Sequence, residues 1–339
     1  MSSLASHLPP HVRRRLGRYK RAILRQPPPP VRPSPPKIGP KATPAAKPVT
    51  PPDPPKPRLQ VRRDFIFATA NRADSILEIG PAHNAILPKR EGFNTKNVDY
   101  LDRGGLVEKY RSYQQYSPDD IEEVDFVLAP GAAMSDAINE RFDVVLASHV
   151  LEHSTSLVHF INELTKLLTD GGVLSLVVPD HRYCFDRFRE RSSLGRVIDA
   201  SHNPPSVHSA GTLAEFTLNA VKHRGTTSWA PGHWGKYEFV HNLDAAKAWL
   251  TREDDGVYVD VHNWIFSPNH LRLLLQDLYD LDLITVREAL FQNTIGHEFF
   301  INLTVDAPGT GLTRQDLLML ADNELRSLDI PEWEPEATA

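Results

Sequence analysis

Segments typical of buried strands alternate with segments typical of helices from residue 75 to residue 178, and this pattern restricts the fold more than any other feature. The strand-like segments span residues 75–80, 96–102, 124–128, 142–148 and 173–178. Parallel strands need long crossover connections, which are usually helices, so strands and helices at this spacing form doubly wound sheets. The sequence therefore predicts an α/β fold with a mostly parallel sheet.

The alternation stops after Pro179 and resumes near residue 268. Residues 180–262 are rich in His, Trp, Arg, Ser and Gly and show helical patterns but no clear strand. Ligands of open α/β sheets bind at the carboxyl ends of the strands. We therefore expect this segment to be an insertion that covers a substrate at that edge. Further elements are predicted as helices over 268–279 and 314–328 and strands over 281–290 and 298–305.

The first 63 residues differ in composition from the rest of the chain. They hold 15 Lys and Arg and 17 of the 29 Pro against a single acid, Asp53, so the remainder is strongly acidic. Proline fixes φ and removes backbone donors, and few apolar residues are available for a core. We expect a disordered basic tail over 1–63, a domain with its insertion over 64–306, and a helix with a frayed end over 307–339.

A basic amphipathic pattern lies within this tail. Val12, Leu16, Tyr19 and Ile23 fall on one side of a helix predicted over 11–25, and Arg and Lys fill the other positions. This pattern favours contact with an anionic membrane surface, and the alternative is a solvated basic tail. Nucleic acid is disfavoured as a partner, because the acidic remainder repels phosphate.

Several classes of protein are excluded by composition. Cys184 is the single cysteine, so no intramolecular disulfide forms. No apolar run approaches the ~20 residues that span a bilayer, and the N-terminus lacks the apolar core of a signal peptide. We expect a cytoplasmic protein, peripheral at the inner face of the cell membrane if the tail binds there.

The end of the first predicted strand indicates the kind of ligand. The segment LEIGPAHN keeps one glycine, Gly80, where a dinucleotide fold needs three, which disfavours a plain NAD enzyme. Glu78 precedes this glycine, and Asp102 ends the second strand. A glycine lets the backbone approach a ligand, and an acid at the second position can accept both hydroxyls of an unphosphorylated ribose. The alternative is that both acids are solvated strand ends.

Five segments in order resemble the class I S-adenosylmethionine-dependent methyltransferases. They are ILEIGP, VDYLD, FDVVLASHVLEH, LLTDGGVLSLVVPD, and HNWIFSPNHLRLLLQDL with the two closing strands. The resemblance implies a Rossmann-like seven-stranded sheet with a terminal antiparallel hairpin, and S-adenosylmethionine as cofactor. The SHVLEH, PDHRYCFDRFR and IGHEFF segments further resemble a bacterial subgroup associated with glycosyltransferases and polysaccharide biosynthesis.

The same resemblance implies which residues contact the cofactor. Gly80 and Pro81 would line the methionine moiety, and Glu78 would support their loop. The remaining implied contacts are Asp102 at the ribose, Asp125 and Phe126 at the adenine, and Ser148 and His149 at the sulfonium.

The chain also departs from the family pattern in the first loop. Ala82 or His83 stands where the family usually keeps a second glycine, and Pro88 shortens the helix that normally follows.

Methyl transfer to a hydroxyl needs a base, and histidine suits this role near neutral pH. Asp180 and His181, at the end of the fifth strand, form the preferred base region, and His153, after the fourth strand, is the second choice. The alternative is that these side chains are caps or packed surface groups. His149 and His153 have a spacing that chelates a metal when both are helical, but no carboxylate-rich cluster or second histidine pair accompanies them, and His149 is expected at the end of the strand. We therefore expect no metal.

The predicted function is S-adenosylmethionine-dependent O-methylation of a sugar in a cell-surface glycan or its precursor. Two alternatives stay open at this point. The first is a catalytically silent methyltransferase-like module that docks a partner. The second is a methyltransferase that acts on a small lipid or metabolite.

Overall fold

A computed structural model describes residues 57–111, 117–129, 131–232, 235–251 and 256–326. The predicted tail lies outside these residues except for its last part, and so does the helix predicted over 11–25. The end of the chain after residue 326 also lies outside them. Within the described ranges, every helix is too short or too polar to cross a membrane.

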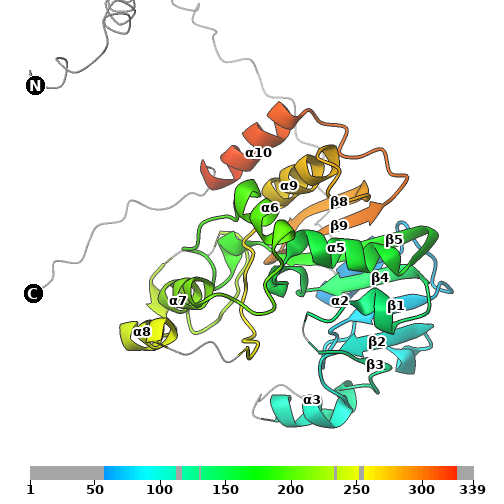
Figure 1. Ribbon diagram of the computed structural model, residues 1–339, viewed down its shortest axis with the longest axis horizontal. Coiled ribbons are helices and arrows are strands. Elements are labelled where there is room, and N and C mark those ends of the chain that lie inside the picture. Colours follow the sequence, from blue (N-terminus) through cyan, green and yellow to red (C-terminus); the bar gives the residue numbers. More distant parts are fainter. Residues whose placement is uncertain (1–56, 112–116, 130, 233–234, 252–255, 327–339) are drawn as a thin grey trace, which may run out of the picture. The chain divides into compact units, whose positions relative to one another are not determined.

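A seven-stranded sheet forms the centre of the fold, in the order β3-β2-β1-β4-β5-β9-β8 (Figure 1). Its strands are β1 (Ile76–Ile79), β2 (Thr95–Asp99), β3 (Phe126–Val127), β4 (Phe142–Ser148), β5 (Leu168–Pro179), β8 (Arg287–Ile295) and β9 (Glu298–Thr304). Strands β1 to β5 are parallel, and β9 is antiparallel to both β5 and β8. The predicted fold, a mostly parallel Rossmann-like sheet with a terminal antiparallel hairpin, is confirmed.

Both faces of this sheet are covered, as its nearly continuous apolar strands require. Leu77 of β1 belongs to one core with side chains of α5 (Leu157–Lys166) and α9 (Pro268–Asp280). Ile76, its neighbour in the strand, points to a second core with side chains of α2 (Arg58–Ile66). A last helix, α10 (Arg314–Arg326), packs on α9.

The segment between β5 and α9 forms the predicted insertion. Its helices are α6 (Leu194–His202), α7 (Ala210–Asn219) and α8 (Leu243–Thr251). It also contains a two-stranded antiparallel sheet of β6 (Val221–His223) and β7 (Tyr237–Phe239), where the sequence showed no clear strand. The other helical elements are α3 (Arg103–Tyr110), α4 (Met134–Ala137), η2 (Lys89–Glu91), η3 (Pro118–Asp120), η4 (Leu151–His153) and η5 (His181–Tyr183).

Two strand boundaries differ from the prediction because of local backbone geometry. Strand β5 begins at Leu168, five residues early, since Gly171 takes a φ of 76° and a bulge forms opposite β4. Strand β8 begins at Arg287, six residues late. The chain between α9 and β8 closes the helix through Asp282, whose φ is 58°, and the Leu283 amide donates to the Leu278 carbonyl at 2.9 Å.

Helix α2 places part of the predicted tail inside the folded domain. Arg62 donates two hydrogen bonds to the buried carboxylate of Glu298, at 2.9 and 2.6 Å. Arg63 donates to the Ile86 carbonyl at 2.8 Å, and Phe65 is buried against the sheet. The boundary expected after residue 63 is therefore wrong. Residues 58–63 are folded because their arginines meet partners that lie far away in the sequence.

Candidate functional site

The loop after β1 adopts the left-handed backbone that a close approach to a ligand requires. Gly80 has a φ of 59° and Ala82 a φ of 46°. Glu78 fixes the chain that follows this loop, because its buried carboxylate accepts hydrogen bonds from the Ile86 and Leu87 amides at 2.7 and 3.2 Å. Burial raises the pKa of Glu78 to about 7. Glu78, Gly80 and Pro81 thus lie together at the carboxyl edge of β1, where the sequence placed them.

Two acids near the end of β2 have different environments. Asp102 is exposed and caps α3, since its carboxylate accepts the Gly105 amide at 2.7 Å. Asp99 is the last residue of β2 and is buried, with the Tyr100 amide at 2.8 Å and the Ala82 amide bonded to its carboxylate. Burial raises the pKa of Asp99. Asp99, and not Asp102, therefore faces the glycine loop, which the sequence analysis missed although both acids belong to the VDYLD segment.

Asp125 and Phe126 are not at the carboxyl edge. Strand β3 begins at Phe126, so Asp125 precedes it, and the Asp125 carboxylate accepts the Asn97 amide at 2.7 Å and pairs with Lys89. The Phe126 ring packs against the core, with the Lys96 ammonium 5.7 Å from its centroid. These positions do not fit the adenine role expected for the two residues. The strand is shorter than predicted, and both side chains contact residues of β2 instead.

Ser148 and His149 lie at the end of β4, next to the glycine loop. Strands β1 and β4 pair so that Ile79 stands opposite Ala147, which brings Gly80 level with Ser148. His149 has a φ of 54°, rare for a residue other than glycine. Its Nε2 lies 2.9 Å from the Glu298 carboxylate. The sequence-predicted cofactor contacts of β1 and β4 are thus brought together at one edge.

Three imidazoles converge on one buried carboxylate just beyond this edge. The carboxylate belongs to Glu152 in η4, and none of it is exposed. Its Oε1 lies 3.7 Å from His149 Nδ1, 3.9 Å from His153 Nε2 and 3.7 Å from His262 Nε2. We call these four residues the Glu152 cluster. Within the described chain, neither oxygen of Glu152 has a hydrogen-bond partner.

Each imidazole of the cluster has a second carboxylate on its far side. His149 Nε2 lies 2.9 Å from Glu298, and His153 Nδ1 lies 2.9 Å from Asp260. The Nδ1 of His262 is hydrogen-bonded to Asp186. Burial alone would lower the pKa of His153, but the contact with Asp260 and the charge of Glu152 raise it. The hydrogen bond with His153 and its charge hold the pKa of Asp260 well below its usual value.

Segments far apart in the chain build this cluster. Glu152 and His153 follow β4, whereas His262 precedes α9 in the segment that ends the insertion. The backbone joins them, because the Asn263 and Trp264 amides donate to the Glu152 carbonyl at 2.7 and 3.0 Å. Sequence analysis missed Glu152, Asp260 and His262. The only signal for these residues in the sequence was a histidine in LEH and another in VHNW, two stretches that overlap the segments resembling the methyltransferases.

Asp180 and His181, the preferred base region, have other partners. The Asp180 carboxylate is fully buried, accepts 2.8 and 2.6 Å hydrogen bonds from the Arg182 guanidinium, and also accepts the Thr294 hydroxyl. These contacts occupy both carboxylate oxygens of Asp180. Burial lowers the pKa of His181 to about 4, so its ring is neutral near pH 7. It faces an open groove of about 590 Å³ with Arg187, Arg191 and His270.

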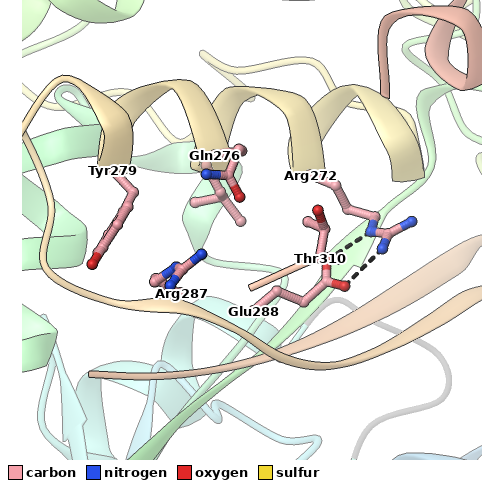
Figure 2. A pocket seen from close by; sticks show the side chains of 7 residues that line it. Arg272, Gln276, Tyr279, Arg287, Glu288 and Thr310 are labelled. Atoms are coloured by element: carbon pink, nitrogen blue, oxygen red, sulfur yellow. Dashed lines mark hydrogen bonds and ion pairs between the residues drawn. The ribbon is translucent and has the colours of Figure 1, made fainter. Parts of the chain in front are cut away.

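A second, much smaller pocket lies away from the carboxyl edge, between α9 and β8. Figure 2 shows Arg272 of α9 and Glu288 of β8 facing each other there, joined by hydrogen bonds of 2.6 and 2.7 Å. Its volume of about 10 Å³ suffices for one water molecule. The ion pair between Arg272 and Glu288 joins α9 to β8, and the pocket beside it is too small for a substrate.

Residues 56–285 match the profile of a family described as a methyltransferase domain. Among curated proteins, no sequence matches this chain. Solved structures with a similar arrangement include three methyltransferases. The CcbJ methyltransferase from Streptomyces caelestis is 17% identical over 41% of this chain and 59% of its own, with a TM-score of 0.28.

The other two cover more of the chain. The glycopeptide N-methyltransferase MtfA complexed with S-adenosylmethionine is 10% identical over 73% of this chain and 93% of its own, with a TM-score of 0.36. An S-adenosylmethionine-dependent methyltransferase from Aquifex aeolicus is 11% identical over 72% and 89%, with a TM-score of 0.35. These identities and TM-scores are low, so the acceptors of these proteins do not indicate the acceptor of this chain.

Proposed function

This chain belongs to the methyltransferase domain family and is an enzyme that uses S-adenosylmethionine, and from that premise we propose that it methylates a sugar hydroxyl of a cell-surface glycan or its precursor. One observation carries the proposal. The left-handed loop at Gly80 and the Glu152 cluster lie at the ends of paired strands, β1 and β4. A methyl donor in that loop therefore has a proton-handling cluster beside it.

The residues at the carboxyl edge suit the two polar ends of the cofactor. Gly80 leaves room for the methionine moiety because it has no side chain, and Ala82 carries only a methyl group. The Asp99 carboxylate is the group that we assign to the ribose hydroxyls, in place of Asp102. Helix α3 and Lys109 border this region, and Lys109 pairs with Asp260 of the insertion at 3.1 Å.

The acceptor side is formed where the insertion meets η4. The Tyr258 hydroxyl donates to the His153 carbonyl at 3.4 Å, and the His208 ring lies 5.2 Å from the Tyr258 ring. His208 is buried, and neither of its ring nitrogens has a hydrogen-bond partner among the described residues. Aromatic faces beside hydrogen-bonding groups suit a sugar, which presents both apolar C–H faces and hydroxyls.

The reaction consists of one displacement. The acceptor oxygen forms a bond to the methyl carbon, the carbon–sulfur bond breaks with its electron pair left on sulfur, and the hydroxyl proton is released at the Glu152 cluster. The products are a methyl ether and S-adenosylhomocysteine. The protein contributes mainly by aligning the three reacting atoms, an effect worth ~7–11 kcal/mol at most.

Titration calorimetry with S-adenosylhomocysteine tests the first part of the proposal. We expect one molecule to bind per chain, and absence of binding would sink the proposal. Turnover is then tested by mass spectrometry of envelope glycans incubated with the protein and S-adenosylmethionine. Binding without turnover on any glycan, lipid or metabolite fraction would favour the catalytically silent docking module. Turnover on a small lipid or metabolite alone would replace the acceptor that we propose.

We further propose that the basic N-terminal segment brings the enzyme to the anionic inner face of the cell membrane. Its 14-unit excess of positive charge over residues 1–63 supports this proposal. Deletion should end at residue 54, before the folded unit begins, since Arg62 is part of the fold. We expect the truncated protein to bind S-adenosylhomocysteine as before and to lose sedimentation with anionic vesicles. Equal sedimentation of both forms would contradict the membrane role.

A further inference from the structure

The Glu152 cluster contains more buried charge than a simple acid–base pair requires. Glu152 is a fully buried carboxylate, and neither of its oxygens has a hydrogen-bond partner in the described part of the chain. A buried charge without a partner costs several kcal/mol, so such a group is normally paired or bound to a metal ion. The three imidazole nitrogens nearest to it stand at 3.7–3.9 Å, beyond hydrogen-bond distance.

Those distances suit donors that share one ion. Two donors bound to a divalent ion at about 2.1 Å in a tetrahedral arrangement stand about 3.4 Å apart. One donor atom each from Glu152, His153 and His262 lie within 4.8 Å of one another. The two separations from Glu152 Oε1, 3.9 Å to His153 Nε2 and 3.7 Å to His262 Nε2, exceed this value by only a few tenths of an ångström. His149 lies on the same carboxylate but does not belong to this group of three.

The outer carboxylates orient the two histidines for this role. Asp260 faces Nδ1 of His153, and Asp186 is bonded to Nδ1 of His262. An acid at Nδ1 favours the tautomer that carries its proton there and turns the Nε2 lone pair toward Glu152. Two lone pairs and a carboxylate then face one another, and a cation between them removes the repulsion.

We propose that Glu152, His153 and His262 bind one divalent transition-metal ion. Two imidazoles and one carboxylate suit zinc and its neighbours in the first transition row, and three protein ligands leave a position open for another oxygen. Its chemical role rests on the function proposed above: the open position takes the acceptor hydroxyl, which loses its proton to water more readily when bound to the ion. Binding of the ion itself does not depend on that function.

Sequence spacing alone argued against this site, because His149 and His153 lacked a further histidine nearby. The missing ligand is His262, which reaches the cluster only in the folded chain. His149, one of the two histidines in the original pair, is 28% exposed and is bonded instead to Glu298. The pair that the spacing suggested is therefore not the pair that the geometry selects.

Metal analysis of the full chain tests this proposal. The protein is stripped with a chelator, dialysed against Zn²⁺, washed, and its zinc is counted per chain by mass spectrometry. We expect one equivalent in the unaltered protein and at least tenfold less in Glu152→Gln and His262→Ala. His159→Ala is the matched control, since His159 is an exposed histidine of α5, and it should retain one equivalent. Circular dichroism checks that each variant is folded.

A second probe makes the result independent of the variants. Co²⁺ bound to nitrogen and oxygen ligands in a four-coordinate site gives visible absorption bands, and we expect the unaltered protein to show them at one equivalent. Failure of the unaltered protein to retain Zn²⁺ or to give the Co²⁺ bands would overturn the proposal, and so would full retention of zinc by folded His262→Ala. S-adenosylhomocysteine binding is measured on the same samples. Cofactor binding without metal rejects only this inference, whereas metal without cofactor binding rejects the proposed function.

Discussion

The ends of β4 and β5 carry the same kinds of side chain, a histidine beside a carboxylate, yet their environments are opposite. After β4, the imidazole of His153 lies between two carboxylates, Glu152 and Asp260. After β5, the carboxylate of Asp180 is bound by Arg182, and the ring of His181 has no hydrogen-bond partner in the described ranges.

The difference shows that adjacency in the sequence is a weak guide to chemistry. Asp180 and His181 are consecutive residues, but the carboxylate of Asp180 pairs with the guanidinium of Arg182 and not with the imidazole of His181. His153 is oriented instead by Asp260, which comes from the end of the insertion. A histidine becomes useful for proton transfer or metal binding when a charged partner orients it, and here that partner is supplied by a distant segment.

The sharpest test of this comparison is catalysis. His153→Ala should lower kcat by a factor of at least 10²–10³, within the usual range for the loss of a proton-handling group. His181→Ala should lower it less than tenfold, because neither ring nitrogen has a hydrogen-bond partner among the residues that the structure describes. Initial rates with the methyl acceptor measure both. If His181→Ala proves the more damaging, the roles assigned to the two strand ends must be exchanged.

Asp180 should matter for stability. Asp180→Ala leaves the guanidinium of Arg182, itself buried, without its ion-pair partner. Removing one member of a buried pair costs about 3–5 kcal/mol, so we expect a loss of about 3 kcal/mol in the free energy of unfolding. Urea unfolding measures it. The comparison fails here if the variant is as stable as the unaltered protein but inactive.

The two acids near the end of β2 extend the same comparison to the cofactor. Asp99→Ala should weaken S-adenosylhomocysteine binding tenfold or more, on the order of 1.5–3 kcal/mol, because a buried contact to the ribose is lost. Asp102→Ala should change it less than threefold, since that carboxylate caps α3. Calorimetry on both variants decides between them. A larger effect at Asp102 would restore the assignment made from the sequence.

Glu78 gives the most gradual effect, because its contribution changes over several pH units. Burial raises its pKa in the folded chain to about 7, above the usual value of about 4.5 in the unfolded chain. Between these values the folded chain holds a proton that the unfolded chain has lost, so stability falls as pH rises from about 4.5 to 7, by at most about 1.4 kcal/mol per pH unit. Glu78→Gln should remove this slope. Urea unfolding of both proteins at pH 5 and pH 7.5 shows it, and parallel changes would contradict the assignment.

Much of the fold was predictable because it depends on local patterns. Strand β4 has the bounds expected from its apolar run, and α9 ends within one residue of its predicted end. Both signals come from consecutive residues, as apolar runs and helix starts do. The errors have two causes. Residues 58–63 fold because Arg62 meets a distant partner, Glu298, and β8 starts late because the local backbone closes α9 through Asp282.

The parallel sheet and the glycine loop at its edge were predictable from the sequence, and the resemblance to the methyltransferases implied S-adenosylmethionine instead of a dinucleotide. These follow from short segments whose chemistry does not depend on what packs against them. Only the tertiary structure decided which acids and histidines act together. Glu152 and His262 lie more than a hundred residues apart in the sequence, yet Asn263 donates its amide to the carbonyl of Glu152. Burial and the partners found there set the charge of each group, and neither property can be read from its neighbours in the chain.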